Sequence, residues 1–438
     1  MESADCVIEV PSDADLECGV LVAPENYAVP EGRQVRMPYI ILHSPSPASG
    51  QTPVMFTEGG PGGISLQSVW GFKNSVLLKD RDVIIFEQRG NLFADPALAC
   101  TMDELFNEED GTSPCYEKLN AMGIDFTQYT TAVLAEDIES LRLALGIEQW
   151  DLLGTSYSTR LVQVLMDKHP EGIRAAIMQA ANPLHDSRHQ HDPEHSYLVL
   201  QVMFEDCAAD PDCASAYPDL ESQFFNLVAE LNDSPIELTL ENPGDGSPIP
   251  YQVSGDTLIN WMVGRAFYGP AFPPYTSAYY PLLISQLAEG KTGALESWAQ
   301  NEIQADLFAP DFIAFGLYFT VNCQDDASLV TKGEIDAQVA DFPEMDNFYR
   351  HLDEWNLCQV WGLPRSEPLV ITVGVLTALQ LLAAASLLVM GILLWVRKHG
   401  TLINRILFTL GTLSVIVFSY FLVKWDMVNI FLSWLGIL

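Results

Sequence analysis

Apolar runs bounded by polar residues recur along the first 184 residues, and each has the length of a buried β-strand. Their ranges are 35–44, 52–60, 82–90, 150–156 and 173–183. A helical repeat of apolar residues covers 131–145, with Gly146 as its stop signal, and a second helix is expected over 157–168. This alternation predicts a mostly parallel sheet with helices on both faces.

The pattern changes after residue 184. Residues 185–365 are mainly helical in pattern, rich in aromatic side chains and interrupted by proline-containing loops, and they show no further strand–helix alternation. We therefore expect an α/β core over 1–184, an inserted helical cap or lid over 185–365, and a membrane segment over 366–438.

The C-terminal end has two apolar stretches of transmembrane length. Residues 369–396 are long enough to span a bilayer, and 406–423 form a shorter second candidate. Arg397, Lys398 and Arg405 lie between them and favour a cytoplasmic turn. The pattern predicts a hairpin anchored in the lipid bilayer, with the large N-terminal part on the periplasmic or extracellular side. The last stretch, 427–438, is too short to span and is expected to lie in the interface.

Cysteine spacing supports the same compartment independently. The eight cysteines fall in four near pairs, Cys6 with Cys18, Cys100 with Cys115, Cys207 with Cys213, and Cys323 with Cys358. None has the spacing of a zinc site, so disulfides are expected in preference to a metal, and disulfides imply an oxidising compartment. The first ten residues lack a signal-peptide pattern. We therefore expect either an upstream start or a leader that has been removed.

A formal net charge of −37 limits the classes of partner. The acidic residues are spread along the chain, which is typical of a solvated, exported surface. Because such a surface repels polyanions, no nucleic acid partner is expected.

Two loops carry candidate chemistry. In the stretch LLGTSYSTR, Ser156 follows a predicted strand and precedes a predicted helix, a turn that exposes a serine hydroxyl when its neighbours are small. Gly154 meets that need, and Ser158 takes the place of the second usual glycine. The stretch FTEGGPGG, residues 56–63, follows another strand and brings backbone N–H groups to a developing oxyanion. Together these loops favour a serine hydrolase site.

In order and spacing, EGGPGG at 58–63, FEQRG at 86–90 and GTSYS at 154–158 resemble the proline iminopeptidase and tripeptidyl aminopeptidase branch of the α/β-hydrolases. The resemblance implies the α/β-hydrolase fold with a helical cap, no cofactor or metal, and release of residues from the free N-termini of peptides. It implies that Ser156 is the nucleophile and that Glu58 binds the substrate amine. The expected oxyanion hole uses backbone amides of Gly60, Gly62, Gly63 and Tyr157.

The usual acidic and histidine members of the triad are not evident. Thr377 falls about where the acid belongs, and His399, in the basic turn, is the only histidine after His351. His185, His189 and Asp186 follow the last predicted strand and are candidate substitutes for the base and acid. His185/His189 and His191/His195 also have the spacing of a helical metal pair, although a polar, solvated start to the cap is the more typical interpretation.

Three hypotheses therefore remain from the sequence. The first is a membrane-anchored aminopeptidase-like hydrolase, either active through a rearranged base or impaired by an incomplete triad. The second is a non-catalytic hydrolase-fold ectodomain that binds peptides or a partner protein. The third is a core that lost its last segment and was joined to a membrane segment.

Overall fold

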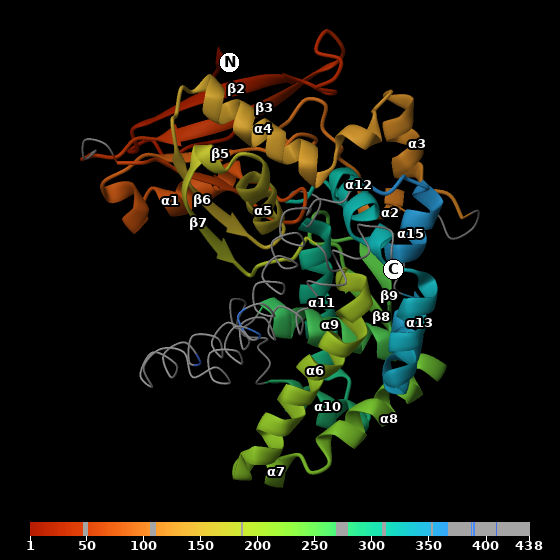
Figure 1. Cartoon of the computed structure of the whole chain (residues 1–438). Coiled ribbons are helices and arrows are strands. Elements are labelled where there is room, and N and C mark those ends of the chain that lie inside the picture. The colour runs from red at the N-terminus through yellow and green to blue at the C-terminus, as the bar shows by residue number, and fades with distance from the viewer. Residues whose placement is uncertain are drawn as a thin grey trace.

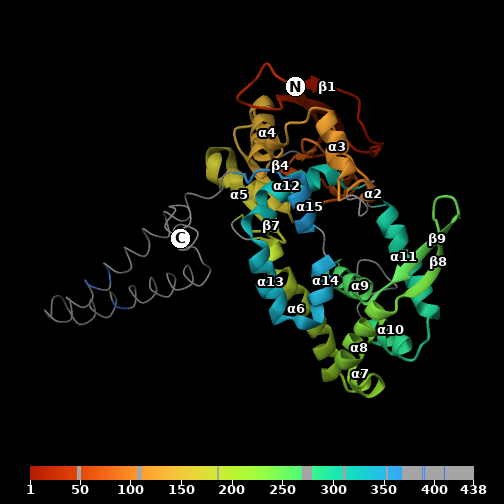
Figure 2. The same cartoon turned by 90° about the vertical axis from the view of Figure 1, so that its right-hand side faces the viewer.

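An α/β core and a largely helical lobe beneath it make up the part of the chain that the computed structural model describes (Figure 1). The described residues are 1–46, 51–105, 111–184, 187–268, 279–308, 312–351 and 354–366, with the single positions 387, 389 and 409. Turning the molecule by 90° keeps the strands of the core at one end and α7 and α8 at the other (Figure 2).

The core is built on a seven-stranded sheet in the order β1-β2-β3-β5-β4-β6-β7. Its strands are β1 Glu2–Ser3, β2 Leu16–Pro24, β3 Gln34–Leu42, β4 Val54–Thr57, β5 Val83–Phe86, β6 Trp150–Thr155 and β7 Ile173–Gln179. β4 pairs in parallel with β5 and β6, and β6 pairs in parallel with β7. β1, β2 and β3 are antiparallel to their neighbours. The five predicted strands are confirmed, and the sheet is mixed at its N-terminal side.

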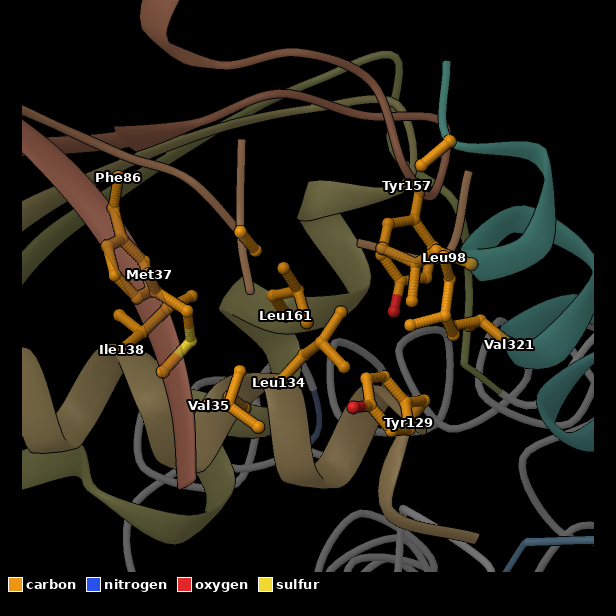
Figure 3. Close-up of a cluster of buried hydrophobic side chains, with 14 of the residues drawn as sticks. Val35, Met37, Phe86, Leu98, Tyr129, Leu134, Ile138, Tyr157, Leu161 and Val321 are labelled. Atoms are coloured by element: carbon orange, nitrogen blue, oxygen red, sulfur yellow. The ribbon is translucent and has the colours of Figure 1, made fainter. Parts of the chain in front are cut away.

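Alternate residues of the central strands enter two different clusters. Ile84 of β5 and Met55 of β4 join one large core cluster, whereas their neighbours Ile85 and Val54 join a second cluster. A strand points successive side chains to opposite faces, so these central strands are buried on both sides. Figure 3 shows the larger cluster, where Leu134 and Ile138 of α4 pack near Met37 and Phe86.

The helices of the core are α1 Val69–Phe72, α2 Met102–Leu105, α3 Pro114–Ala121, α4 Thr131–Ala144 and α5 Ser158–Lys168. α4 ends within a residue of the predicted boundary, and Gly146 just beyond it has a φ of +69°. Glycine is favoured at that position because a left-handed backbone conformation costs it little.

The lower lobe has its own hydrophobic cluster, which includes Phe224, Trp261 and Trp298. Its elements are α6 Arg188–Ala209, α7 Pro211–Ala216, α8 Leu220–Asp233, β8 Ile236–Glu241, β9 Pro248–Val253, α9 Gly255–Tyr268, α10 Tyr280–Ala288, α11 Gly293–Phe308, α13 Lys332–Asp341 and α14 Asp346–His351. The antiparallel hairpin β8–β9 was not predicted. Its strands are joined by residues 242–247 and include both ends of the proline-containing stretch at 241–250, whose turn residues mask the short alternation on either side.

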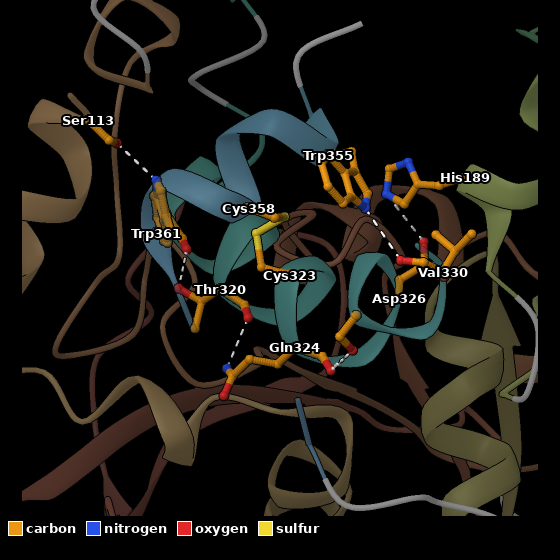
Figure 4. The surroundings of a disulfide bond; sticks show 12 residues. Ser113, His189, Thr320, Cys323, Gln324, Asp326, Val330, Trp355, Cys358 and Trp361 are labelled. Atoms are coloured by element: carbon orange, nitrogen blue, oxygen red, sulfur yellow. Dashed lines mark hydrogen bonds and ion pairs between the residues drawn. A yellow bond between two sulfur atoms is a disulfide. The ribbon is translucent and has the colours of Figure 1, made fainter. Parts of the chain in front are cut away.

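Two helices near the end of this range, one before and one after α13 and α14 in sequence, pack on the α/β core. α12 (Phe315–Asp325) and α15 (Glu354–Trp361) place Leu317, Val321, Leu357 and Trp361 in the large core cluster. The disulfide Cys323–Cys358 joins the two helices (Figure 4). Part of the range that the sequence pattern assigns to a cap is thus integral to the core.

β7 is less covered than the other parallel strands within the described residues. Ile177 is 58% exposed and Met178 is 40% exposed, and these consecutive side chains point to opposite faces. In the part of the chain that the structure describes, β7 pairs only with β6. β7, which follows α5, is therefore the least covered strand in the parallel part of the sheet.

All four predicted disulfides are confirmed, at Cys6–Cys18, Cys100–Cys115, Cys207–Cys213 and Cys323–Cys358. The predicted membrane stretches, 369–396, 406–423 and 427–438, lie outside the described residues apart from the isolated positions 387, 389 and 409. Among the helices that are described, none has the length and apolar character needed to cross a bilayer.

Candidate active site

Ser156 lies in a strained turn between β6 and α5. Its φ is +54°, a left-handed value that a residue with a side chain rarely adopts, and its side chain is exposed. The Ser156 N–H donates to the carbonyl of Gln179 at 2.9 Å, and the Ser156 carbonyl accepts from the N–H and Oγ1 of Thr159 at 3.0 and 2.6 Å. The turn is therefore held from both β7 and α5, as a nucleophile on a strand-to-helix turn requires.

The small neighbours of Ser156 have separate structural reasons. A Cβ on Gly154 would come within 2.9 Å of Val162 Cγ2 and 3.0 Å of the Ser158 carbonyl, so a side chain would force the helix away from the strand. Ser158 is fully buried, and its Oγ accepts from the Thr155 N–H at 2.7 Å and donates to the Thr155 carbonyl at 2.9 Å. A serine thus replaces the usual glycine by satisfying its hydroxyl within the turn.

The glycine-rich loop after β4 lies directly against Ser156. A Cβ on Gly59 would come within 2.8 Å of Ser156 Cβ and 3.3 Å of its Oγ. Gly60 and Gly62 have φ values of +107° and +85°, which allow the loop to turn this tightly. The structure therefore brings together the two loops that the sequence singled out.

The predicted oxyanion donors differ in what they contact. The Gly63 N–H already donates to the Gly59 carbonyl at 3.1 Å within the loop. Among the described residues, no hydrogen bond is formed by the amides of Gly60, Gly62 and Tyr157. Tyr157 directly follows Ser156, and its side chain is buried. The amides of Gly62 and Tyr157 thus keep donor capacity for a substrate oxygen, and the oxyanion hole stays a prediction.

Glu58 folds back on the same loop. Its Oε1 accepts from the Gly59 N–H at 3.1 Å, and its backbone N–H and carbonyl contact Ser65 Oγ and Gln88 Nε2 at 3.0 and 2.7 Å. The side chain is half-buried. Its role with a substrate amine is untested, and its contact with the Gly59 N–H is a structural one.

Glu87 is hydrogen-bonded to the two residues Ser65 and Leu66, just after the glycine-rich loop. The fully buried carboxyl accepts from the N–H groups of Ser65 and Leu66 at 3.2 and 3.1 Å. Burial raises the pKa of Glu87 to about 8, and the nearby Glu58 charge acts in the same direction. A largely neutral carboxyl at this position fixes the start of the segment that follows the glycines.

The structure does not place a general base at Ser156. Within the described ranges, Ser156 Oγ has no hydrogen-bond partner. His185 and Asp186 lie outside the described residues. His189 is buried rather than solvated, and its Nε2 lies 3.7 Å from Asp326 Oδ2 (Figure 4). The rings of His191 and His195 stack at 5.8 Å.

Sequence reasoning overlooked two adjacent carboxylates at the end of α12. Asp326 forms ion pairs with Arg160 of α5 and Arg188 of α6, each at 3.2 Å. Asp325 contacts Thr131, which contacts Tyr157. The available signal was the pair of adjacent acids in VNCQDD at the end of a helix that begins with apolar residues, where buried carboxylates need partners.

Two further features lie away from Ser156. Ligand atoms of Glu139, His169 and Glu171 come within 4.8 Å of one another, but both Glu139 oxygens accept from Arg142 at 2.7 and 2.8 Å, so the charge is already balanced. A cavity of about 360 Å³ lies between α6, α7 and α8, lined in part by Phe204, Tyr217 and Leu220. No residue of the Ser156 turn or the glycine-rich loop lines it.

Comparison with known proteins agrees with this geometry. A family model described as alpha/beta hydrolase fold matches residues 52–213, which contain both loops. Tripeptidyl aminopeptidase of Streptomyces lividans is 23% identical over 406 residues, which cover 84% of this chain and 72% of the relative. Serine protease Hip1 of Mycobacterium bovis is 26% identical over 206 residues, 41% of this chain and 38% of the relative. Proline iminopeptidase of Neisseria gonorrhoeae is 28% identical over 127 residues, 29% of this chain and 32% of the relative.

Proposed function

Starting from an α/β-hydrolase fold whose relatives are named as peptidases, we propose that this chain is a serine hydrolase that forms an acyl-enzyme on Ser156. The observation that carries the proposal is the exposed Ser156 in its strained turn, with the glycine-rich loop packed against its Oγ. The strained turn does not stabilise the fold by itself, since a positive φ at a serine costs on the order of 1–3 kcal/mol.

The proposed reaction begins when Ser156 Oγ attacks a carbonyl carbon. The hydroxyl proton passes to a base, the Oγ–C bond forms, and the carbonyl oxygen gains negative charge that the amides of Gly62 and Tyr157 stabilise. The C–N bond then breaks, and the leaving amine takes the proton from the base. Water, activated by the same base, hydrolyses the ester and restores the Ser156 hydroxyl.

The proposed substrates are peptides with a free N-terminus. Cleavage near that end would release the N-terminal residues. The name of the S. lividans relative, tripeptidyl aminopeptidase, supports this class, as does the acidic Glu58 beside the nucleophile. Its Oε1 receives one backbone N–H, and a substrate ammonium would be a second, charge-assisted donor to the same carboxylate.

We further propose that the chain is anchored in a bilayer through residues 369–396 and 406–423, with the core on the periplasmic or extracellular side. The apolar pattern and the basic residues between the stretches support this orientation. The four disulfides support an oxidising compartment. Extraction of membranes with alkaline carbonate should leave the protein in the pellet, and a protein found in the supernatant would contradict the anchor.

A second candidate is a non-catalytic ectodomain that binds peptides or a partner protein. It is favoured by one observation, that Ser156 Oγ has no hydrogen-bond partner among the residues that the structure describes. Without a base, most of the rate enhancement of a serine hydrolase is lost.

Reaction of the detergent-solubilised protein with a fluorophosphonate probe separates the two candidates. We expect covalent labelling that is lost in Ser156→Ala and retained in Ser158→Ala, because the Ser158 hydroxyl is buried in the turn. His189→Ala, with the half-buried His191→Ala as its matched control, tests the described candidate for the base. Absence of labelling in the folded wild-type protein would contradict the hydrolase and favour the binding protein.

A further inference from the structure

The residue after the nucleophile is tied to α12 by a directed chain of hydrogen bonds. Asp325 Oδ2 accepts from both the N–H and the Oγ1 of Thr131, each at 2.6 Å. Since the Thr131 hydroxyl proton is used in that bond, Thr131 Oγ1 accepts from the Tyr157 hydroxyl at 3.0 Å. All three side chains are buried, so each bond is formed out of water, where an unpaired polar group is costly.

The residues just before α12 contact the other side of the predicted oxyanion hole, the glycine-rich loop. The Ala314 N–H donates to the Gly62 carbonyl at 2.9 Å, and the Ile64 N–H donates to the Phe312 carbonyl at 3.1 Å. A Cβ on Gly62 would come within 2.8 Å of the Ala314 carbonyl, so the two backbones are in close contact. One segment, residues 312–326, therefore contacts the glycine-rich loop directly and reaches the Ser156 turn through Thr131.

The helix of the nucleophile is fastened to the same segment one turn further on. Arg160 Nη2 pairs with Asp326 Oδ1 at 3.2 Å, and both side chains are almost completely buried. The Arg160 guanidinium also donates to the Pro183 carbonyl from Nη2 at 2.9 Å and from Nε at 3.1 Å. Arg160 thereby fixes the body of α5. The position of the Tyr157 amide depends instead on the hydrogen bonds that run from Tyr157 through Thr131 to Asp325.

We propose that Asp325 is a positioning residue for the oxyanion hole, acting through Thr131 and the Tyr157 side chain to aim the Tyr157 amide at the developing negative charge. This inference rests on the proposed function. The geometry explains why a buried acid lies at the end of an apolar helix, since a carboxylate accepts both Thr131 donors at once and sets the direction of the Tyr157 bond. Asp325 itself touches neither Ser156 nor a substrate in this arrangement.

Inactivation kinetics with the fluorophosphonate probe test the proposal in the full-length protein. We expect Thr131→Val and Tyr157→Phe each to lower the maximal inactivation rate by about tenfold, less than the loss of a whole oxyanion donor, and to leave the half-saturating probe concentration unchanged. The double variant should be no slower than either single variant, because both break the same chain. Asp325→Ala should behave alike, with the rate largely restored in Asp325→Asn, whose amide oxygen still accepts from Thr131.

Tyr129→Phe is the matched control. Tyr129 is a buried tyrosine of the same core cluster, but its hydroxyl donates to Glu25 at 3.1 Å and does not contact the turn. Wild-type rates in Thr131→Val and Tyr157→Phe would overturn the proposal, as would an equal loss in Tyr129→Phe or a multiplicative loss in the double variant. A wild-type protein that fails to label at all would instead remove the proposed function, and this inference with it.

Discussion

The two ends of the seven-stranded sheet differ in how well their strands are paired and covered. The end formed by β1, β2 and β3 is the completed end, and the end formed by β7 is the exposed end. At one end, β2 pairs with β3 over nine residues, β1 adds a short outer strand, and the disulfide Cys6–Cys18 fixes the N-terminal segment beside it. At the other end, β7 pairs with β6, and its apolar side chains are exposed on both faces within the described residues. Parallel strands are normally buried on both faces, so the second end is the unusual one.

The contrast matters because the turn that carries Ser156 is hydrogen-bonded to the exposed end. The Ser156 N–H donates to the carbonyl of Gln179, the last residue of β7, whereas the glycine-rich loop follows β4 in the fully buried centre. One half of the candidate site therefore rests on a well-packed strand and the other on a poorly covered one.

The largest effect is expected at the completed end. Arg89 and Asp137 form a fully buried pair with bonds of 2.5 and 2.6 Å, and Arg89 also donates to the Glu25 carbonyl at 2.7 Å. Asp137→Ala should lower the free energy of unfolding by about 3–5 kcal/mol, because it leaves a buried guanidinium without its counter-charge. Urea titration followed by tryptophan fluorescence measures this change.

Arg174→Ala on β7 is the control for Asp137→Ala. Arg174 also pairs with a carboxylate, Asp151, but its side chain is 49% exposed. We expect a loss below about 1 kcal/mol. Equal losses in the two variants would mean that the two ends of the sheet do not differ in the way their burial indicates.

A smaller effect is expected from the disulfide at the completed end. Replacing Cys6 and Cys18 by serine opens a loop with a sequence separation of 12, for which the chain-entropy estimate is about 3 kcal/mol. The same replacement of Cys207 and Cys213, with a separation of 6, should cost about 2 kcal/mol. A larger loss for the second pair would show that loop closure is not what stabilises the N-terminal edge.

The buried Glu87, which follows β5 in the centre of the sheet, should make the free energy of unfolding depend on pH. Burial raises the pKa of Glu87 from 4.5 to about 8, so the folded state holds a proton that the unfolded state releases between those values. The free energy of unfolding should therefore fall by about 1.4 kcal/mol per pH unit as the pH rises through that window. Glu87→Gln, which keeps an acceptor oxygen for Ser65 and Leu66, should remove the Glu87 share of the slope and leave any share from Asp325, whose pKa burial also raises.

Urea titrations from pH 5 to pH 8 check the Glu87 prediction. The exposed Glu171→Gln is the control and should keep the slope of the wild-type protein. If the slope is undiminished in Glu87→Gln, another group carries the pH dependence, and the buried centre would be less strained than its geometry indicates.

The sequence predicted the features that depend on local patterns. The five strands, the helix that starts at Thr131 and the loop against Ser156 follow from apolar periodicity and from small residues at tight turns. Near spacing likewise identified all four disulfide pairs.

The features that were missed depend on contacts across long stretches of chain. Thr131 and Asp325 are 194 positions apart, and the partners of Asp326 lie on α5 and α6, so no local pattern could join them. The exposure of Ile177 and Met178 within the described residues is likewise not visible in the apolar run at 173–183, which reads like the run of any buried strand. Burial is a property of the neighbours, and the sequence pattern of one strand does not contain them.

The smallest loss of stability is expected from Ile177→Ala on β7, and Ile85→Ala on the buried strand β5 provides the comparison. Ile85 of β5 is fully buried, and Ile85→Ala should lower the free energy of unfolding by about 2–5 kcal/mol through lost contacts and a residual cavity. Ile177 of β7 is 58% exposed, so Ile177→Ala should cost less than about 0.5 kcal/mol if this face is open to solvent. A loss for Ile177→Ala that approaches the loss for Ile85→Ala would show that this face of β7 is covered in the full-length protein. The difference between the buried centre of the sheet and its β7 end would then belong to the described residues and not to the whole molecule.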